Sequence, residues 1–104
     1  MLSVVLITVP DQETAELVAK ALLEPRLAAC VNILPSVRSL YWWEGKIGSA
    51  SEILLIAKTE PRLIPELADA VRAVHPYKVP EIVALTASFA AESYLGWVKA
   101  ETKK

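Results

Sequence analysis

The chain of 104 residues contains few of the residues that conventional active sites need: one histidine, one cysteine and three glycines. The single cysteine, Cys30, cannot form a disulfide within the chain, so nothing in the sequence indicates an oxidising compartment. Three glycines do not form a glycine-rich phosphate loop, and one histidine without a fixed partner does not make a catalytic triad. We therefore expect a protein that is not an enzyme.

Neither an excess of one charge nor a long apolar run is present. Eleven basic residues stand against twelve acidic ones, for a net charge of −1, and the arginines are dispersed. This balance disfavours nucleic acid and anionic membranes as partners. No apolar run approaches the roughly 20 residues of a membrane span, and "MLSVVLITV" lacks the basic start and the cleavage site of a signal peptide. We expect a cytoplasmic protein.

Hydrophobic residues make up 54% of the chain, which is enough for the core of one domain covering residues 1–104. Apolar periodicity and the prolines predict the elements. Strands are expected at 2–9, 27–43 with a bulge at Pro35, 51–59 and 81–87, with a hairpin turn within 45–51. Helices are expected from Asp11 to Pro25, from a cap at Thr59 or Glu60 to His75, and from a cap at Ser88 onward. The fold class is thus α+β, a ferredoxin-like βαββαβ arrangement with a long central hairpin and an extra C-terminal helix.

The central strands are apolar on both faces. In "SEILLIAKT", Leu54 and Ile56 alternate with Ile53, Leu55 and Ala57. A ferredoxin-like fold places its two main helices on one face of the sheet, which leaves the other face uncovered. Soluble monomers rarely expose so large an apolar surface. We therefore expect a homo-oligomer whose copies cover this face.

Cys30 and His75 are the softest metal donors apart from Met1 at the chain end, and thiolate and imidazole suit copper or zinc. Both residues also have a purely structural interpretation. Cys30 can be a small buried hydrophobe, and His75 can cap the end of the second helix. Pro76 and Pro80 fix the corner around His75 in either case.

The carboxylates offer weaker signals. Glu52, Glu81 and Glu44 could supply oxygen ligands, although their spacing indicates no acid–base pair. The aromatic stretch "YWWEG" at 41–45 can pack against a neighbouring subunit or form the wall of a cleft between subunits.

Five motifs in order resemble the CutA family of divalent-cation tolerance proteins. They are Val9–Asp11, "RLAACVNILP" at 26–35, Ser39–Gly45, Glu52–Thr59 and "HPYKVPEI" at 75–82. The resemblance implies a ferredoxin-like protomer in a tight trimer, with long hairpins that reach onto neighbours, and a kinship with PII signalling proteins. Some metal-associated members have a cysteine in the first strand and a second histidine before "HPY"; this sequence has Ile7 and Val74 there.

Two functional hypotheses follow from the residues and the resemblance. The first is a non-enzymatic trimer for tolerance of copper or another divalent metal, with weak binding between subunits through His75, Cys30 and Glu81 and no cofactor required for folding. The alternative is a PII-like signalling or scaffold trimer that binds a small ligand or a protein segment. The walls of its intersubunit cleft would be Tyr41, Trp43, Glu52, Lys58 and Tyr77.

Overall fold

One four-stranded sheet carries the fold, in the order β2-β3-β1-β4 with every neighbouring pair antiparallel. The computed structural model describes all residues, 1–104. The strands are β1 (Ser3–Val9), β2 (Cys30–Trp43), β3 (Lys46–Thr59) and β4 (Ile82–Thr86). The helices are α1 (Gln12–Leu23), α2 (Ile64–Val74) and α3 (Glu92–Glu101), with a 3-10 turn at Pro61–Leu63 before α2. The α+β class and the ferredoxin-like element order are confirmed.

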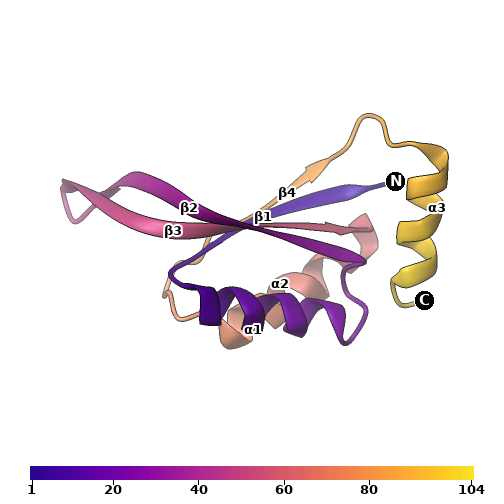
Figure 1. Cartoon of the computed structure of the whole chain (residues 1–104), viewed down its shortest axis with the longest axis horizontal. Coiled ribbons are helices and arrows are strands. Elements are labelled where there is room, and N and C mark those ends of the chain that lie inside the picture. The colour runs from indigo at the N-terminus through magenta and orange to yellow at the C-terminus, as the bar shows by residue number, and fades with distance from the viewer.

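Helices α1 and α2 lie together on one face of the sheet, and the β2–β3 hairpin projects beyond them (Figure 1). The chain therefore measures 44 × 26 × 22 Å. A cluster of 14 buried apolar residues fills the space between this face and the two helices. On β1 it includes Val5, Ile7 and Val9, which alternate with half-exposed residues that point the other way. The core is thus complete on the helix side alone.

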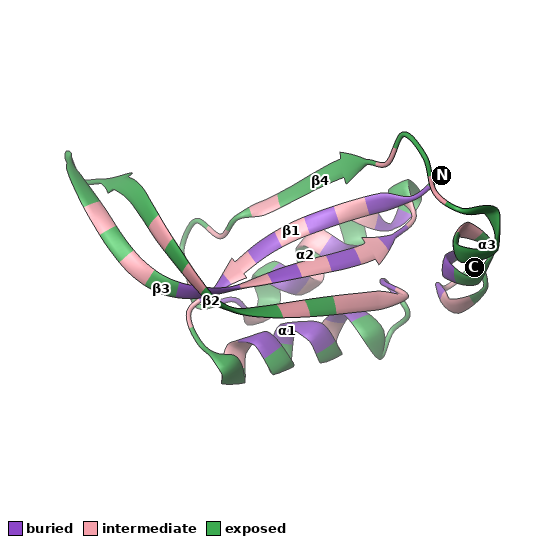
Figure 2. Ribbon diagram, turned by 45° about the horizontal axis from the view of Figure 1, so that its top comes forward, coloured by how far each residue is buried: buried purple, intermediate pink, exposed green.

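The opposite face of the sheet has no helix over it. Its exposed apolar side chains include Leu34, Val83 and Leu85, which are 38%, 44% and 51% exposed. In the burial view, β4 and the projecting half of the hairpin are mostly exposed, whereas β1 and the inner half of β3 alternate (Figure 2). We call this surface the open face. The apolar face expected from the sequence is present, and nothing within the chain covers it.

The hairpin turn is tighter than the sequence indicated. We expected a turn within 45–51, but Trp43 already pairs with Lys46, so only Glu44 and Gly45 connect the strands. Both have positive φ angles, 49° and 78°, as in a two-residue type I′ turn, which matches the twist of the flanking strands. Residues 46–50 therefore extend β3 to 14 residues.

Two further boundaries were predicted wrongly. β2 begins at Cys30, not at Leu27, because Arg26 turns the chain with φ 60° and the Leu27 N–H bonds back to the Leu22 carbonyl at 2.9 Å. α3 begins at Glu92 with Ala91 before it, so Ser88 does not cap it. The expected bulge at Pro35 is confirmed, since the β2–β3 register shifts between Leu34 and Val37.

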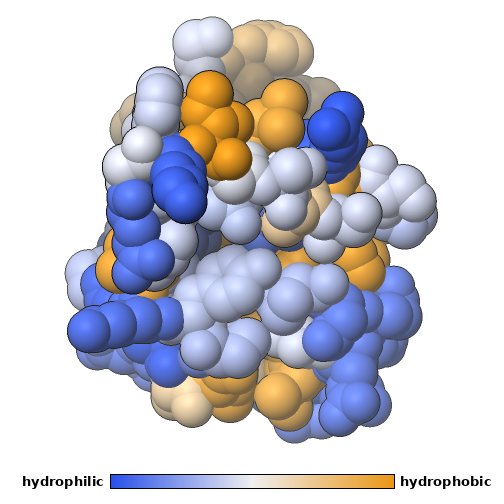
Figure 3. Space-filling model, turned by 90° about the vertical axis from the view of Figure 1, so that its left-hand side faces the viewer, coloured by the Kyte–Doolittle hydropathy of each residue, from blue (hydrophilic) through white to orange (hydrophobic).

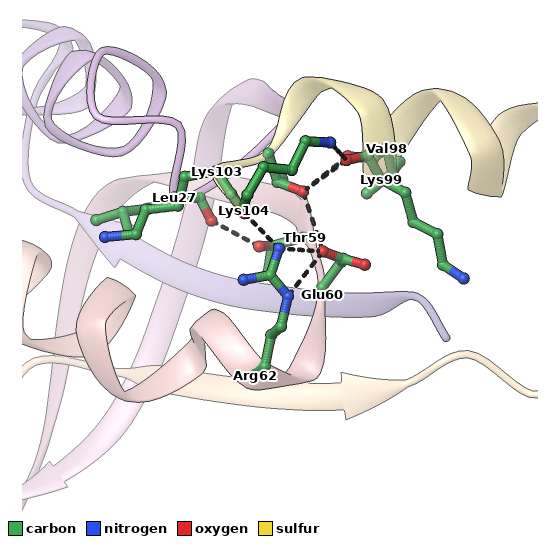
Figure 4. Close-up of polar contacts among 9 residues, drawn as sticks. Leu27, Thr59, Glu60, Arg62, Val98, Lys99, Lys103 and Lys104 are labelled. Atoms are coloured by element: carbon green, nitrogen blue, oxygen red, sulfur yellow. Dashed lines mark hydrogen bonds and ion pairs between the residues drawn. The ribbon is translucent and has the colours of Figure 1, made fainter.

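Of the two expected caps of the second helix, Glu60 stands at the N-cap position of the 3-10 turn that precedes α2, but its side chain makes no capping hydrogen bond, and α2 itself starts after Leu63. The Thr59 hydroxyl donates to the Leu27 carbonyl at 2.6 Å, and the Glu60 carboxylate accepts from Arg62 at 2.7 Å and from Thr102 at 3.2 Å. Arg62 also donates to the Lys103 carbonyl. These contacts tie the C-terminal tail to the start of α2 (Figure 4). They anchor α3 at the end of the sheet.

The glycines give a test of the turn. Nothing lies within 4 Å of a Cβ added at Gly45 or at Gly96, which is inside α3, so the two sites differ in backbone conformation and not in available space. Gly45→Ala should lower the free energy of unfolding by about 1 kcal/mol, because its φ is unfavourable for side chains. Gly96→Ala should raise it by roughly 0.5–1 kcal/mol, since alanine favours helix. Denaturant unfolding at one protein concentration measures both, and equal shifts in the two variants would contradict the assigned turn.

Candidate functional site

A cavity of about 860 Å³ lies between the projecting arm of the hairpin and the segment that joins α2 to β4. It brings together residues from β1, β2, β3 and the 76–81 segment. The lining residues are Thr8, Arg38, Ser39, Leu40, Tyr41, Trp43, Glu52, Pro76, Tyr77, Lys78, Val79 and Glu81. Seen from the hairpin end, pale side chains of intermediate hydropathy adjoin orange hydrophobic ones, with blue hydrophilic side chains at the flanks (Figure 3). The lining therefore offers a ligand both apolar or aromatic contacts and charged groups.

The only histidine holds one wall of this cavity in place. The Nε2–H of His75 donates to the Thr8 carbonyl at 2.8 Å, and Nδ1 accepts the Tyr77 backbone N–H at 3.1 Å. Because a carbonyl only accepts and an amide N–H only donates, these partners require the neutral imidazole with its proton on Nε2. Thr8 lies just beyond the last β1–β4 pair, at Ile7, so the imidazole contacts the strand where β4 no longer does. His75 is the C-cap residue of α2 as expected, but through its backbone N–H, which donates to the Val71 carbonyl at 2.9 Å, while its side chain fixes the corner.

Tyr77 follows in the same chain of contacts. Its hydroxyl donates to Glu52 Oε2 at 2.8 Å, and its ring lies 4.8 Å from the His75 ring, centroid to centroid. Partial burial, the hydrogen bond to Glu52 and the negative charge of that carboxylate raise the pKa of Tyr77 to about 12. The phenol therefore remains a donor at any physiological pH.

Glu52 and its neighbour Ile53 are both buried, although they point to opposite faces of β3. Glu52 stands next to the bulge, opposite Val37, in the first pair of the projecting arm. The bulge is on β2, where two residues oppose Ile53, and it locally bends and twists that strand beside Glu52. The loop through Tyr77 then covers the carboxylate, which is 8% exposed.

Tyr41 reaches the cavity because of a glycine that the sequence gave no reason to single out. Gly48 is its partner across the hairpin, and a Cβ on Gly48 would lie 3.0 Å from Cε2 of the Tyr41 ring. The missing side chain leaves the space in which this ring lies over β3.

The structure brings together most of the predicted cleft residues. Tyr41, Trp43, Glu52 and Tyr77 line the cavity together with Glu81, which had been expected as a metal donor. Sequence reasoning missed Thr8, Arg38, Lys78 and the other lining residues; proximity to "HPY" and "YWW" was the only signal for them. Lys58 does not line the cavity. It is six residues from Glu52 along β3, or about 20 Å, and it donates to Asn32 Oδ1.

Cys30 lies in a separate place. It pairs with Lys58 across the β2–β3 ladder, and its Sγ is 4.0 Å from Asn32 Oδ1. On the α3 side it contacts Tyr94, whose pKa is raised by burial first and then by the charge and hydrogen bond of Cys30. No three His, Cys, Asp or Glu side chains within the chain are close enough to hold a metal ion. Residues of one chain therefore do not fit a metal centre, and His75 offers no free ring nitrogen in this conformation.

The Tyr77 contact gives a pH prediction. The raised pKa favours the neutral phenol in the folded chain, so its contribution to stability is complete below the ordinary value of 10.0 and is lost as the pH rises through about 12. Absorbance titration at tyrosinate wavelengths, taken as the difference between wild type and Tyr77→Phe, should show a midpoint near 12. Glu52→Gln should move it towards 10, because the negative charge is removed while burial stays, and Glu24→Gln serves as the unaffected control. A wild-type midpoint near 10 would contradict the Tyr77–Glu52 contact.

Comparison with known proteins agrees with the family resemblance that the five sequence motifs indicated. The family model described as CutA1 divalent ion tolerance protein matches residues 3–101. A "Divalent-cation tolerance protein CutA" of Thermus thermophilus is 50% identical over 102 residues, which cover 98% of this chain and 99% of that protein. A solved Thermus thermophilus structure of the same name superposes with a TM-score of 0.96, 50% identity and coverage of 99% of this chain and 100% of that one.

A plant relative shows that the match can be part of a longer protein. "Protein CutA, chloroplastic" of Arabidopsis thaliana is 45% identical over 100 residues, and these residues cover 96% of this chain but 55% of that protein. The family model and the Thermus relative both span nearly all of this chain. The chain belongs to the CutA1 family of divalent ion tolerance proteins.

Proposed function

We propose that this protein supports tolerance of divalent cations as a non-enzymatic homotrimer that binds metal ions weakly at sites completed between subunits. The observation that carries the proposal is the open face, where Leu34, Val83 and Leu85 have no cover within the chain. Copies of the same chain supply that cover in the proposed trimer. The names of the relatives supply the link to divalent cations.

The donor geometry supports metal sites between chains and not within one. Cys30 and the Glu81 carboxylate lie in different regions of a single chain, so another copy would have to complete any ligand set that includes either of them. Thiolate suits copper and zinc, and the carboxylate adds an oxygen donor. His75 can join such a set only after the Tyr77 N–H leaves Nδ1 or Nε2 leaves Thr8.

The absence of catalysis belongs to the same proposal. Neither Cys30 nor His75 lines the cavity, and the imidazole of His75, although it lies beside Thr8, has both ring nitrogens engaged by backbone groups and is not free to act as a base. The cytoplasmic location stays a prediction, since one relative carries a chloroplastic name. None of the helices is long and apolar enough to cross a membrane.

A second function is favoured by the cavity itself. At about 860 Å³, with aromatic walls and convergent polar groups, it has the size and lining of a small-molecule site. A PII-like role, in which a small ligand or a protein segment occupies this cleft between subunits, is the alternative.

Sedimentation tests the assembly. At micromolar concentration the wild-type chain should sediment as a trimer. Leu85→Glu should dissociate it or weaken it strongly, because a charge on the open face must lose its water in the interface. Leu17→Glu is the matched control, since Leu17 on α1 is 50% exposed and Leu85 51%. A well-folded wild-type monomer at this concentration would contradict the proposal.

Calorimetric titration with Cu²⁺ tests the metal sites. Cys30→Ser should weaken binding by about tenfold or more, because it replaces the soft thiolate with a poor copper ligand. Glu81→Gln should weaken it less, and His75→Ala reports whether the imidazole takes part, since unchanged binding removes it from the site. Wild-type affinity in both Cys30→Ser and Glu81→Gln would rule out the proposed donors.

A further inference from the structure

Glu52 carries a buried carboxylate that has no ionic partner within the chain. Its carboxylate is 8% exposed and lines the cavity, yet none of the four ion pairs of the chain includes it. Oε2 accepts the Tyr77 hydroxyl, and no protein group donates to Oε1. Oε1 is also not sealed away, since no fully buried side-chain oxygen lacks a partner. One carboxylate oxygen is therefore accessible from outside and has no donor within the chain.

A carboxylate in this position favours a cationic guest. Removing a carboxylate from water costs free energy unless a positive charge and hydrogen bonds compensate it, and Tyr77 supplies only one neutral donor. Glu52 also contributes the negative charge that helps to raise the pKa of Tyr77. A ligand that brings a positive charge and N–H donors to Oε1 would supply the interaction that this oxygen lacks.

The walls around the carboxylate fit an organic cation better than a metal ion. Tyr41, Trp43 and Tyr77 present aromatic rings to the same cavity, and such rings attract cations at their faces. Divalent ions need several oxygen, nitrogen or sulfur ligands, and no three acidic, histidine or cysteine side chains converge here. Arg38 and Lys78 also line the cavity and balance the charges of Glu52 and Glu81, so a preference for cations rests on the position of Glu52 and the aromatic rings and not on the net charge of the lining.

We propose that this cavity binds a small organic molecule through a protonated amine, with Glu52 as the counter-ion and the rings of Tyr41, Trp43 and Tyr77 against its apolar body. The proposal rests on the second function given above, a small-ligand cleft, and specifies its ligand class. The cavity of about 860 Å³ accommodates an arylalkylamine.

Three probes that share an indole ring separate charge from shape. Tryptamine carries the protonated amine, tryptophol is neutral, and indole-3-propionate is an anion. Calorimetry on the full chain should show tryptamine binding at least about tenfold more tightly than either of the others, because only its ammonium can pair with Glu52. Amide shifts of Tyr77 and Trp43 in NMR spectra should locate the site. Equal binding of the three probes, or no binding of tryptamine, would overturn the proposal.

Substitutions assign the effect to Glu52. Glu52→Gln keeps the shape and an acceptor but removes the charge, so it should weaken tryptamine about tenfold and leave tryptophol unchanged. Glu24→Gln, an exposed acid beyond the end of α1, should change neither. Wild-type tryptamine affinity in Glu52→Gln would contradict the assigned counter-ion. If Glu52→Gln does not fold, Tyr77→Phe keeps the test: it retains the ring and removes the one donor to the carboxylate, so tryptamine should still bind at least about tenfold more tightly than tryptophol, and loss of that preference would contradict the proposal.

The outcome is separable from that of the metal proposal. Sedimentation and Cu²⁺ titration of the same wild-type sample report the trimer and the metal sites without the amine. A trimer that binds Cu²⁺ but no tryptamine would overturn the ligand class alone. Zn²⁺ binding that is lost in Glu52→Gln, together with no tryptamine binding, would assign the carboxylate to metal instead.

Discussion

The one-sided cover of the sheet is the constraint on which the rest of the structure depends. β1 and β3 are apolar on both faces, but α1 and α2 pack on only one of them. On the helix side, Val5, Ile7 and Leu55 are fully buried without help from another chain. On the other side, apolar side chains of β2 and β4 remain exposed. The same sequence therefore encodes a complete core and an incomplete surface, and the incomplete surface is the physical basis for assembly.

The segment between α2 and β4 connects this architecture to the cavity. His75 uses one ring nitrogen to hold β1 at Thr8 and the other to hold the backbone of Tyr77, and Tyr77 then reaches Glu52 on β3. Three separate elements are thus joined through two side chains. This arrangement explains why a lone histidine stands between prolines without making a nucleophilic or acid–base site: its lone pair and its N–H are both used to position the wall.

Periodicity in the sequence predicted the sheet, the helices and the bulge, because those features follow from local patterns. The wrong boundaries lie where backbone conformation decides and side chains give little signal. Arg26 and Glu44 adopt positive φ without being glycine or asparagine, and each moves the start of a strand. Ser88 has the right chemistry for a cap, but α3 begins at Glu92 after Ala91, without any side-chain cap. A local capping preference therefore did not decide where this helix starts.

The sequence predicted several residues of the candidate site, but it did not predict how they are arranged in space. Adjacent motifs pointed to Tyr41, Trp43, Glu52, Tyr77 and Glu81, which do share one cavity. Lys58 belongs to the same stretch as Glu52, yet the length of β3 puts it about 20 Å away, beside Cys30. That separation has a chemical consequence. The soft thiol lies at one end of the β2–β3 ladder and the buried carboxylate at the start of the projecting arm, so metal binding through Cys30 and amine binding at Glu52 use different atoms, and only Glu81 belongs both to the proposed metal donors and to the cavity.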